Sequence, residues 1–462
     1  MANKKLKSIG NNKNTTLMVI VLTAFMTTFS GSALNLSIPS IDSEFHAGAA
    51  AIGWVINGYI LAGAALSVPF GRIADLTGRE RILKIGLLCF SVSSGLICLV
   101  NSIELLLLLR ILQGIGGAMI FATNQAVLIG NYPPEKRGKI LGYLISATYV
   151  GLTTGPVLGG FMNQFFGWRS IMLLSFVLGV ATFFAAIKAL PGNSGNNASG
   201  GDMDYLGMVL FAAAVGGLMY GLSAFSTVFY AKYLIPAAAV LSVIFVRHEL
   251  RVSSPVIQIR LFRKNISYLL SNLAALLNYG ATFAVGYLMS IYLQVVRGFD
   301  SSAAGLVLIS QPLIMALLSP YAGRLSDRIS PHKLASFGMG LCALGLFFFI
   351  FTTADRSLIA IIANLVVMGL GFALFSTPNT NAVMACVEPK DYGVASSILA
   401  TMRHLGQSSN MAVVMFIAAI YLGNTPLKEA KAEIMVQIMK VSFTLFTFLC
   451  TLGIFISLKR NK

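Results

Sequence analysis

Long apolar runs recur from Leu17 to Leu458, and they limit the folds open to this chain. Runs of about 20 residues are long enough for a helix to cross the roughly 30 Å hydrocarbon layer of a membrane. Backbone groups in that layer must bond within the protein, so only helices or closed barrels can span it. The runs are continuous rather than alternating, which favours helices. The sequence therefore predicts an all-α integral membrane protein.

Turn residues and charges divide the 462 residues into fourteen predicted transmembrane helices. An even number of spans places both termini on one side. Most of the 33 Lys and Arg residues fall in the termini and in the loops on that side, and short cytoplasmic loops carry such an excess. We therefore expect cytoplasmic N- and C-termini in a multi-pass protein of the cell membrane. The net charge of +17 then reflects topology and contact with the anionic lipid bilayer, not nucleic acid.

An internal repeat divides the chain. GRIADLTGRER at 71–81 recurs as GRLSDRISPHK at 323–333. Two six-helix bundles are therefore expected, at residues 1–190 and 266–462, as in many secondary transporters. Residues 191–265 form a linker that begins with a Gly, Ser and Asn-rich stretch and holds two inserted helices.

Several motifs resemble those of a known family. GRIADLTGRER looks like the loop signature of the major facilitator superfamily, and LLLRILQGIGGAM at 107–119 is similar to its fourth-helix pattern. GLTTGPVLGG at 151–160 is similar to a fifth-helix motif associated with exporters. DYLG at 204–207 resembles the fourteen-helix drug/proton antiporter branch, the multidrug efflux type. The resemblance covers nearly the whole chain.

The charged loop and its second copy supply the predicted conformational latch. Its residues are Gly71, Asp75, Gly78, Arg79 and Asp327. Glycine permits a tight connection between helices. By resemblance, the charges join the two halves when the cytoplasmic side is closed and release them when it opens. The alternative is a solvated loop whose arginines only set the topology.

The predicted exporter motif consists of glycines and one proline on a single apolar stretch. Its residues are Gly151, Gly155, Pro156, Gly159 and Gly160. Glycine removes bulk and proline removes a backbone hydrogen bond, so this helix is expected to bend and to pack closely on a neighbour. Ordinary small-residue packing would produce the same pattern. The outward direction of transport is implied by the resemblance alone.

Charge inside a membrane is costly and therefore mostly functional. Arg110 and Arg403 are predicted within spans, whereas all 16 Asp and Glu fall in loops or at helix ends. The family commonly carries an Asp in its first helix, and Ser30 stands at that place here. His404 is then the candidate for proton coupling, because an ordinary histidine titrates near neutral pH. The alternative is a neutral histidine that lines the cavity or faces a neighbouring helix.

Seven polar side chains predicted near mid-depth are candidates to line a central substrate cavity. They are Asn35, Tyr59, Gln113, Tyr149, Asn278, Tyr279 and Gln311. The 31 Phe and 19 Met residues would add a surface suited to flat hydrophobic compounds. Since no carboxylate is predicted at mid-membrane, neutral or anionic amphiphiles are favoured over cations as substrates. Arg110 or Arg403 would attract the anions.

No catalytic grouping, metal-ligand spacing or phosphate-binding loop stands out, so we expect no enzyme, no metal or other cofactor and no use of ATP. The five cysteines lie singly in apolar runs, as core residues do. The sequence predicts a monomeric secondary exporter of small hydrophobic or amphiphilic substrates, coupled to protons. Two alternatives stay open: an exporter of an endogenous lipid, metabolite or peptide-like compound, and a non-transporting membrane sensor with the same fold.

Overall fold

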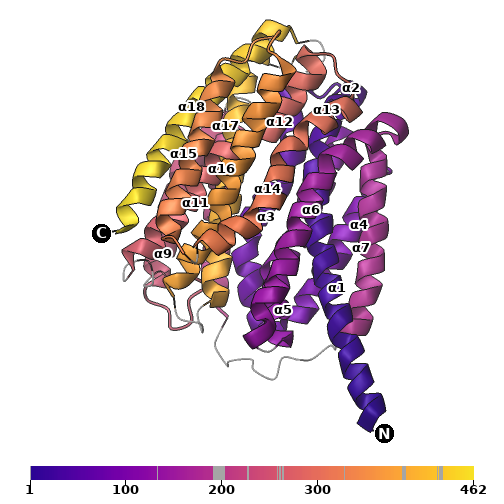
Figure 1. The fold of residues 1–462 in the computed structure, drawn as a ribbon, viewed down its shortest axis with the longest axis vertical. Helices are drawn as coiled ribbons and strands as arrows, with labels where there is room; N and C mark the ends of the chain where they lie inside the picture. Colours follow the sequence, from indigo (N-terminus) through magenta and orange to yellow (C-terminus); the bar gives the residue numbers. More distant parts are fainter. Residues whose placement is uncertain are drawn as a thin grey trace.

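The chain folds into long helices that run back and forth along one axis (Figure 1). A computed structural model describes residues 2–132, 134–190, 203–225, 228–257, 259, 262, 265–326, 328–387, 392–423, 425 and 430–461. All secondary structure in these ranges is helical. The predicted all-α architecture is therefore confirmed.

The N-terminal half begins with α1 (Ala2–Leu34), which continues through a 3-10 turn at Asn35–Ser37 into α2 (Ile38–Phe45). Pro39 lies in the first turn of α2, where its missing N–H breaks no helical hydrogen bond. The remaining helices of this half are α3 (Gly48–Thr77), α4 (Arg79–Ile97), α5 (Ile103–Asn131), α6 (Pro134–Phe166) and α7 (Arg169–Ala189).

Two inserted helices, α8 (Tyr205–Ser223) and α9 (Ala231–Glu249), form a hairpin after the N-terminal half. The C-terminal half follows. Its helices are α11 (Ile266–Thr282), α12 (Val285–Ile291) with the π-helical turn η2 (Tyr292–Val296), α13 (Ser301–Leu308), α14 (Ser310–Ser326), α15 (Pro331–Ile350), α16 (Leu358–Ala385), α17 (Tyr392–Leu422) and α18 (Ala432–Leu458), which ends in the 3-10 turn η5 (Lys459–Asn461).

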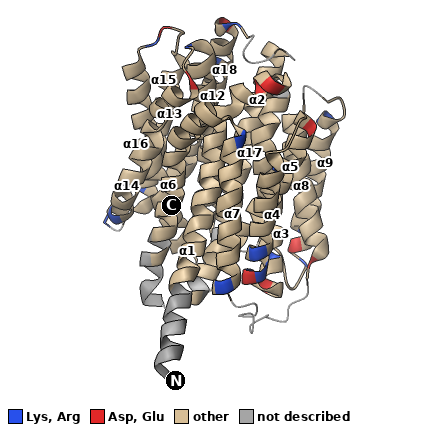
Figure 2. Ribbon diagram, turned by 90° about the vertical axis from the view of Figure 1, so that its right-hand side faces the viewer, with Lys and Arg blue, Asp and Glu red and all other residues tan. Residues whose placement is uncertain are grey.

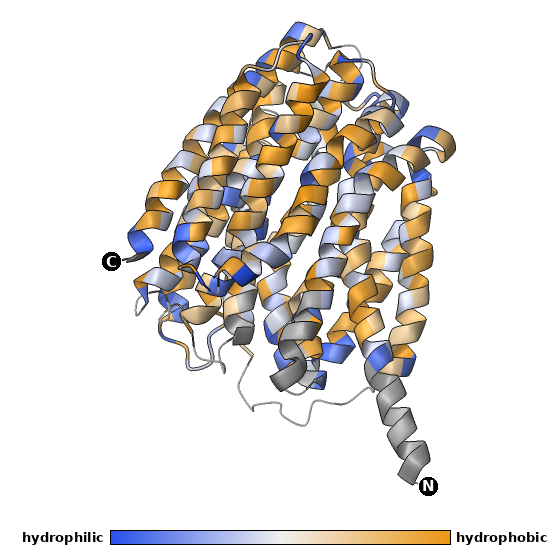
Figure 3. Cartoon of the chain, viewed as in Figure 1, coloured by the Kyte–Doolittle hydropathy of each residue, from blue (hydrophilic) through white to orange (hydrophobic). Residues whose placement is uncertain are grey.

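The helices have the surface of a membrane protein. Figure 2 shows charged residues gathered mainly at the two ends of the helices, and Figure 3 shows apolar residues along most of their length. Large apolar side chains face outward in mid-helix, such as Leu108 (54% exposed), Phe184 (59%) and Phe448 (66%). Exposure of this kind suits contact with lipid rather than water.

Twelve helical segments within the described ranges are long and apolar enough to cross a membrane. The sequence also predicts spans at α4 and α6, which are helices of 19 and 33 residues and are not among these twelve. The first turns of α4 are charged, with Arg79, Glu80, Arg81 and Lys84.

The two halves meet along two lines of contact, which we call seams. In one seam α3 packs against α17, and in the other α6 packs against α13 and α14 (Figure 1). The inserted helix α8 packs on both α3 and α17, so it covers the first seam. A functional site shared by the halves is therefore expected at these helices or at the helices that pack beside them.

Candidate functional site

Four of the five predicted latch residues lie in α3, in α4 or in the connection between them. Gly78 joins the helices with φ of 112° and ψ of 116°, a conformation that side-chain-bearing residues rarely adopt. The Asp75 carboxylate lies 2.7 Å from Arg79 Nε, one turn along the chain, and both side chains are exposed. Such a pair contributes only about 0.3–0.5 kcal/mol. Gly71 lies inside α3, and Asp327 lies outside the described residues.

The exporter-motif glycines let α6 approach two other helices. Gly151, Gly155 and Gly159 pack on α1, where added Cβ atoms would collide with Thr28, Ser32 and Ala33 respectively. On the α13 side, a Cβ on Gly160 would collide with the Ser301 carbonyl. A Cβ on the facing glycine of the C-terminal half, Gly305, would likewise collide with the Pro156 carbonyl. The motif therefore brings backbones of the two halves into direct contact.

A group of polar side chains closes the same seam near its α2 end. We call Asn163, Ser290, Gln294 and Ser301 the seam cluster. Asn163 Nδ2 donates to Ser301 Oγ at 2.6 Å, Ser290 Oγ donates to the Asn35 carbonyl at 2.8 Å, and Gln294 Nε2 donates to the Leu36 carbonyl at 3.2 Å. Each bond joins the N-terminal half to the C-terminal half. Of the predicted cavity residues, only Asn35 takes part, through its backbone.

Arg110, Gln113 and Tyr59 come together inside the N-terminal half. The Arg110 side chain is 2% exposed, donates from Nε to the Val55 carbonyl at 2.8 Å and bonds to Gln113 Oε1. Its guanidinium carbon lies 4.7 Å from the centre of the Tyr59 ring, and Gln113 Nε2 donates to Ser94 Oγ at 2.7 Å. None of the described ion pairs includes Arg110. The hydrogen-bond acceptors and the face of the Tyr59 ring stabilise the Arg110 charge. Together with the bond from Gln113 to Ser94, these contacts connect α3, α4 and α5.

Arg403 lies instead beside the seams. Its Nη2 donates to Thr380 Oγ1 at 2.6 Å, and its guanidinium carbon lies 5.4 Å from the Tyr279 ring centre. The Tyr279 hydroxyl is 3.2 Å from Ser376 Oγ, and Tyr149 of α6 lies close enough to Tyr279 to interact electrostatically. We call Tyr149, Tyr279, Ser376, Thr380 and Arg403 the central site. Arg403 Nε has no hydrogen-bond partner in it.

His404 is next to this site and faces the N-terminal half. Its ring lies 5.2 Å from that of Phe121 on α5, edge to face, and its Nδ1 would lie 3.8 Å from a Cβ on Gly63 of α3. Nδ1 has no hydrogen-bond partner. The surroundings are thus an aromatic edge, a glycine, the neighbouring Arg403 and the side chain of Gln407, which hydrogen-bonds to the ring.

Asn57 connects all three parts of the chain. Its Nδ2 donates to Ser223 Oγ of α8 at 2.7 Å, and its Oδ1 accepts from Ser408 Oγ of α17 at 3.0 Å. Asn57 is fully buried. Two predicted cavity residues lie apart from these contacts: Asn278 is fully buried in α11, and Gln311 is half-buried on α14.

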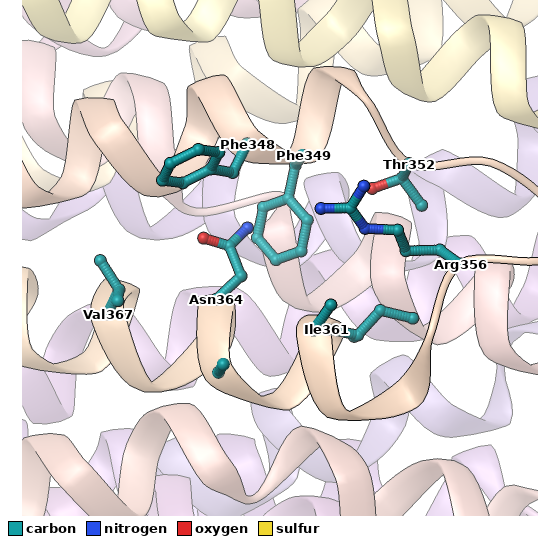
Figure 4. A pocket seen from close by; sticks show the side chains of 9 residues that line it. Phe348, Phe349, Thr352, Arg356, Ile361, Asn364 and Val367 are labelled. Atoms are coloured by element: carbon teal, nitrogen blue, oxygen red, sulfur yellow. The ribbon is translucent and has the colours of Figure 1, made fainter.

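A cavity of about 280 Å³ lies between the end of α15 and the start of α16. Figure 4 shows Phe348, Phe349, Asn364 and Arg356 around it. It is lined by none of the seven predicted cavity residues and by no residue of the central site. It is therefore a separate feature of the C-terminal half.

Comparisons with known proteins agree with this architecture. The model of the family described as "Major Facilitator Superfamily" matches residues 20–411 and 271–459. The "Riboflavin transporter RibZ" of Clostridioides difficile is 30% identical over 389 residues, 84% of each chain. The "Multidrug resistance protein Stp" of Mycobacterium tuberculosis is 30% identical over 415 residues, 89% of this chain and 76% of that one. A solved structure, a bacterial homolog of the human lysosomal transporter Spinster described as inward-facing and unoccupied, has a TM-score of 0.69 at 15% identity, covering 97% and 98% of the two chains.

Proposed function

The chain belongs to the Major Facilitator Superfamily, and on that premise we propose that this multi-pass transporter exports amphiphilic compounds by secondary active transport. The observation that carries the proposal is the central site. Arg403 and Tyr279 come from different helices of the C-terminal half, with the guanidinium carbon 5.4 Å from the ring centre. Tyr149 of α6 is within electrostatic range of Tyr279, and the adjoining His404 contacts Phe121 of the N-terminal half. A relative named as a multidrug resistance protein supports efflux.

Alternating access would operate through the seam cluster. We infer that the end carrying this cluster faces the outside, because the opposite end carries most of the basic loops and both termini. In this orientation α4 and α6 complete fourteen spans, and residues 1–190 and 266–462 rock as two units about the linker at 191–265. Release of substrate outward requires the Asn163, Ser290 and Gln294 bonds to break. Gly71, Asp75, Gly78, Arg79 and Asp327 would close the other end in turn.

The substrate class follows from the charge of the central site. None of the described ion pairs includes Arg403, so its free Nε can donate to a carbonyl or acid group of a substrate. The aromatic rings of Tyr279 and Phe372, 5.1 Å apart, would hold a flat apolar body beside it. Neutral and anionic amphiphiles fit this site, whereas a cation would meet a like charge.

His404 is better suited to the neutral role. Its ring packs against Phe121 and adjoins a permanent positive charge. A second charge would have no counter-ion among the described ion pairs. In this role it fixes the distance between α17 and α5, and the proton binds elsewhere.

The test uses purified protein in liposomes with an imposed pH gradient and a dye for internal pH. Cationic, neutral and anionic amphiphiles are added to wild type, Arg403→Gln and His404→Gln. We expect neutral or anionic compounds to evoke proton flux, Arg403→Gln to raise the concentration needed by about tenfold or more, and His404→Gln to retain flux. Arg356→Gln, in the separate cavity of Figure 4, is the matched control.

Two outcomes would contradict the proposal. Undiminished transport of monovalent lipophilic cations, with no response to anions, would exclude the substrate class. Absence of flux with every compound, in a protein that is folded, would favour an endogenous substrate or a non-transporting sensor.

A further inference from the structure

Three titratable side chains meet where α8 begins and α9 ends. Asp204 precedes α8, and its Oδ1 accepts from the Gly207 N–H at 2.8 Å and lies 2.7 Å from His248 Nε2. Glu249 ends α9, and its Oε2 accepts from the Ile257 N–H at 2.8 Å. The two acidic residues are only 8% and 2% exposed. A pair of acids is thus buried at the base of the inserted hairpin.

The second oxygens of these two acids face each other without a donor. Asp204 Oδ2 and Glu249 Oε1 are buried and have no hydrogen-bond partner, although the two carboxyl groups interact side chain to side chain. Both oxygens lie where a Cβ on Gly207 would stand, so the absence of a side chain there makes room for them. Ionised carboxylates only accept hydrogen bonds. Two of them facing in a dry site would repel each other and leave both oxygens unsatisfied.

We propose that Asp204 and Glu249 bind one proton between Oδ2 and Oε1 and form a proton-binding site at the base of the α8–α9 hairpin. One proton satisfies both oxygens, since a protonated carboxyl donates to the other. Burial raises the pKa of Asp204, but hydrogen bonds from His248 and the Gly207 N–H outweigh burial and lower it. Asp204 is therefore the ionised partner, and Glu249 carries the proton.

Few titratable groups surround the pair. His248, on α9, is the titratable side chain that contacts it, with Nε2 2.7 Å from Asp204 Oδ1. Of the described residues of α3 and α17, the helices packed on α8, none contributes a charge to either one. The other contacts are the two backbone N–H groups.

The site is placed to act on both halves. Ile257, bonded to Glu249, belongs to a buried apolar cluster that spans the hairpin and both halves. Its members include Val68 of α3, Phe211 of α8, Phe245 of α9 and Leu399 of α17. Loss of the proton puts two negative charges at the edge of this cluster and should loosen the hairpin from the first seam.

Infrared spectroscopy of the purified protein at neutral pH tests the site directly. We expect the C=O stretching band of a protonated carboxyl in wild type, and loss of that band in Glu249→Gln, whose amide still accepts from Ile257 and donates to Asp204. Glu433→Gln, the same change at an exposed position, should keep the band. An identical band in wild type and Glu249→Gln, or none in wild type, would overturn the proposal.

Thermal unfolding supplies a second readout. The folded pair holds a proton that the unfolded chain gives up near its ordinary pKa of about 4, so wild-type stability should fall as pH rises above about 4 and should level off once the folded pair has released its proton. Glu249→Gln and Asp204→Asn should both lose this dependence, and Asn at position 204 can still cap α8. Either variant decides the matter if the other fails to fold, and a wild-type slope retained in the variants would refute the site. Neither measurement uses a substrate, so failure of the proposed export function leaves this test intact.

Discussion

Weakening the seam cluster should open the α2 end of the molecule by a calculable amount. The double variant Asn163→Ala/Ser290→Ala removes two bonds between the halves, to Ser301 Oγ and to the Asn35 carbonyl. Ser301 keeps Gln294 Oε1 as its acceptor at 3.1 Å, so no buried donor is orphaned. The Asn35 carbonyl loses the Ser290 donor in the closed state, which adds to the effect, so the bond energies alone give its lower limit.

The magnitude follows from hydrogen bonds measured in other membrane proteins. Interhelical side-chain bonds are worth about 0.6 kcal/mol on average and up to about 1.7. Two of them give about 1–3 kcal/mol, which shifts the ratio of open to closed molecules by about 5- to 150-fold. While the open state stays a minor one, access from outside rises by the same factor.

Cysteine labelling in whole cells measures this access. Asn35→Cys in a background without the five native cysteines keeps the backbone carbonyl that Ser290 needs. Its rate of reaction with a membrane-impermeant maleimide should rise by the calculated factor in the double variant. Asn364→Ala is the matched control, because Asn364 Nδ2 donates to the Gly345 carbonyl at 2.9 Å within the C-terminal half. Equal labelling in all three folded proteins would refute the role of the seam cluster.

Three further predictions concern stability in detergent. The Gly78→Ala variant should lose about 1–3 kcal/mol of its free energy of unfolding, because a backbone φ of 112° is strained for a residue with a side chain. Gly71→Ala, inside α3, should keep the wild-type stability. Equal thermal unfolding of the two variants would contradict this prediction. Arg110→Met should cost about 2–4 kcal/mol, because the Val55 carbonyl and Gln113 Oε1 lose their donor, and flux per folded molecule should persist; lost flux in folded protein would place Arg110 in transport. The lowered pKa of Asp204 means that its stabilisation is present above the unfolded value of about 3.9 and is lost as pH falls through the folded value; Asp204→Asn should flatten that acid limb in a thermal titration.

The all-helical membrane architecture could be predicted because membrane spans require long apolar runs, and the chain has them; twelve of the described helical segments meet the criteria for a span, and the count of fourteen stays a prediction. Helix orientation about its own axis could not be predicted. Lipid and the protein core are both apolar, so a transmembrane helix carries little periodicity to show which side faces inward. The sequence therefore does not distinguish the role of Arg110 from that of Arg403, since both are predicted as charges inside membrane spans. In the structure the first is enclosed in one half, and the second reaches the central site.

The contacts between the two halves could not be predicted from the sequence either. Asn163 and Ser301 lie far apart in the chain, and neither belongs to a recognisable motif, although Asn163 follows Gly160 by one turn. Thr380 bonds back to the Ser376 carbonyl at 2.8 Å, as hydroxyl residues of membrane helices commonly do. The sequence around Thr380 therefore does not indicate that its hydroxyl also accepts a hydrogen bond from Arg403. By contrast, the pairing of Asp75 with Arg79 could be expected from their one-turn spacing.

The hydrogen bonds of Asn57 bear on how the inserted hairpin could be lost or gained. Excising α8 and α9 and rejoining the chain would yield a shorter transporter, but it would strip Asn57 Nδ2 of Ser223 Oγ, its acceptor. A fully buried amide left without that acceptor costs about 1–3 kcal/mol. A deletion should therefore be tolerated best together with an apolar residue at position 57. That substitution would also remove the acceptor of the Ser408 hydroxyl, which now donates to Asn57 Oδ1. The hairpin is thus not an independent spacer, because its removal would change polar contacts inside the bundle as well as the length of the chain.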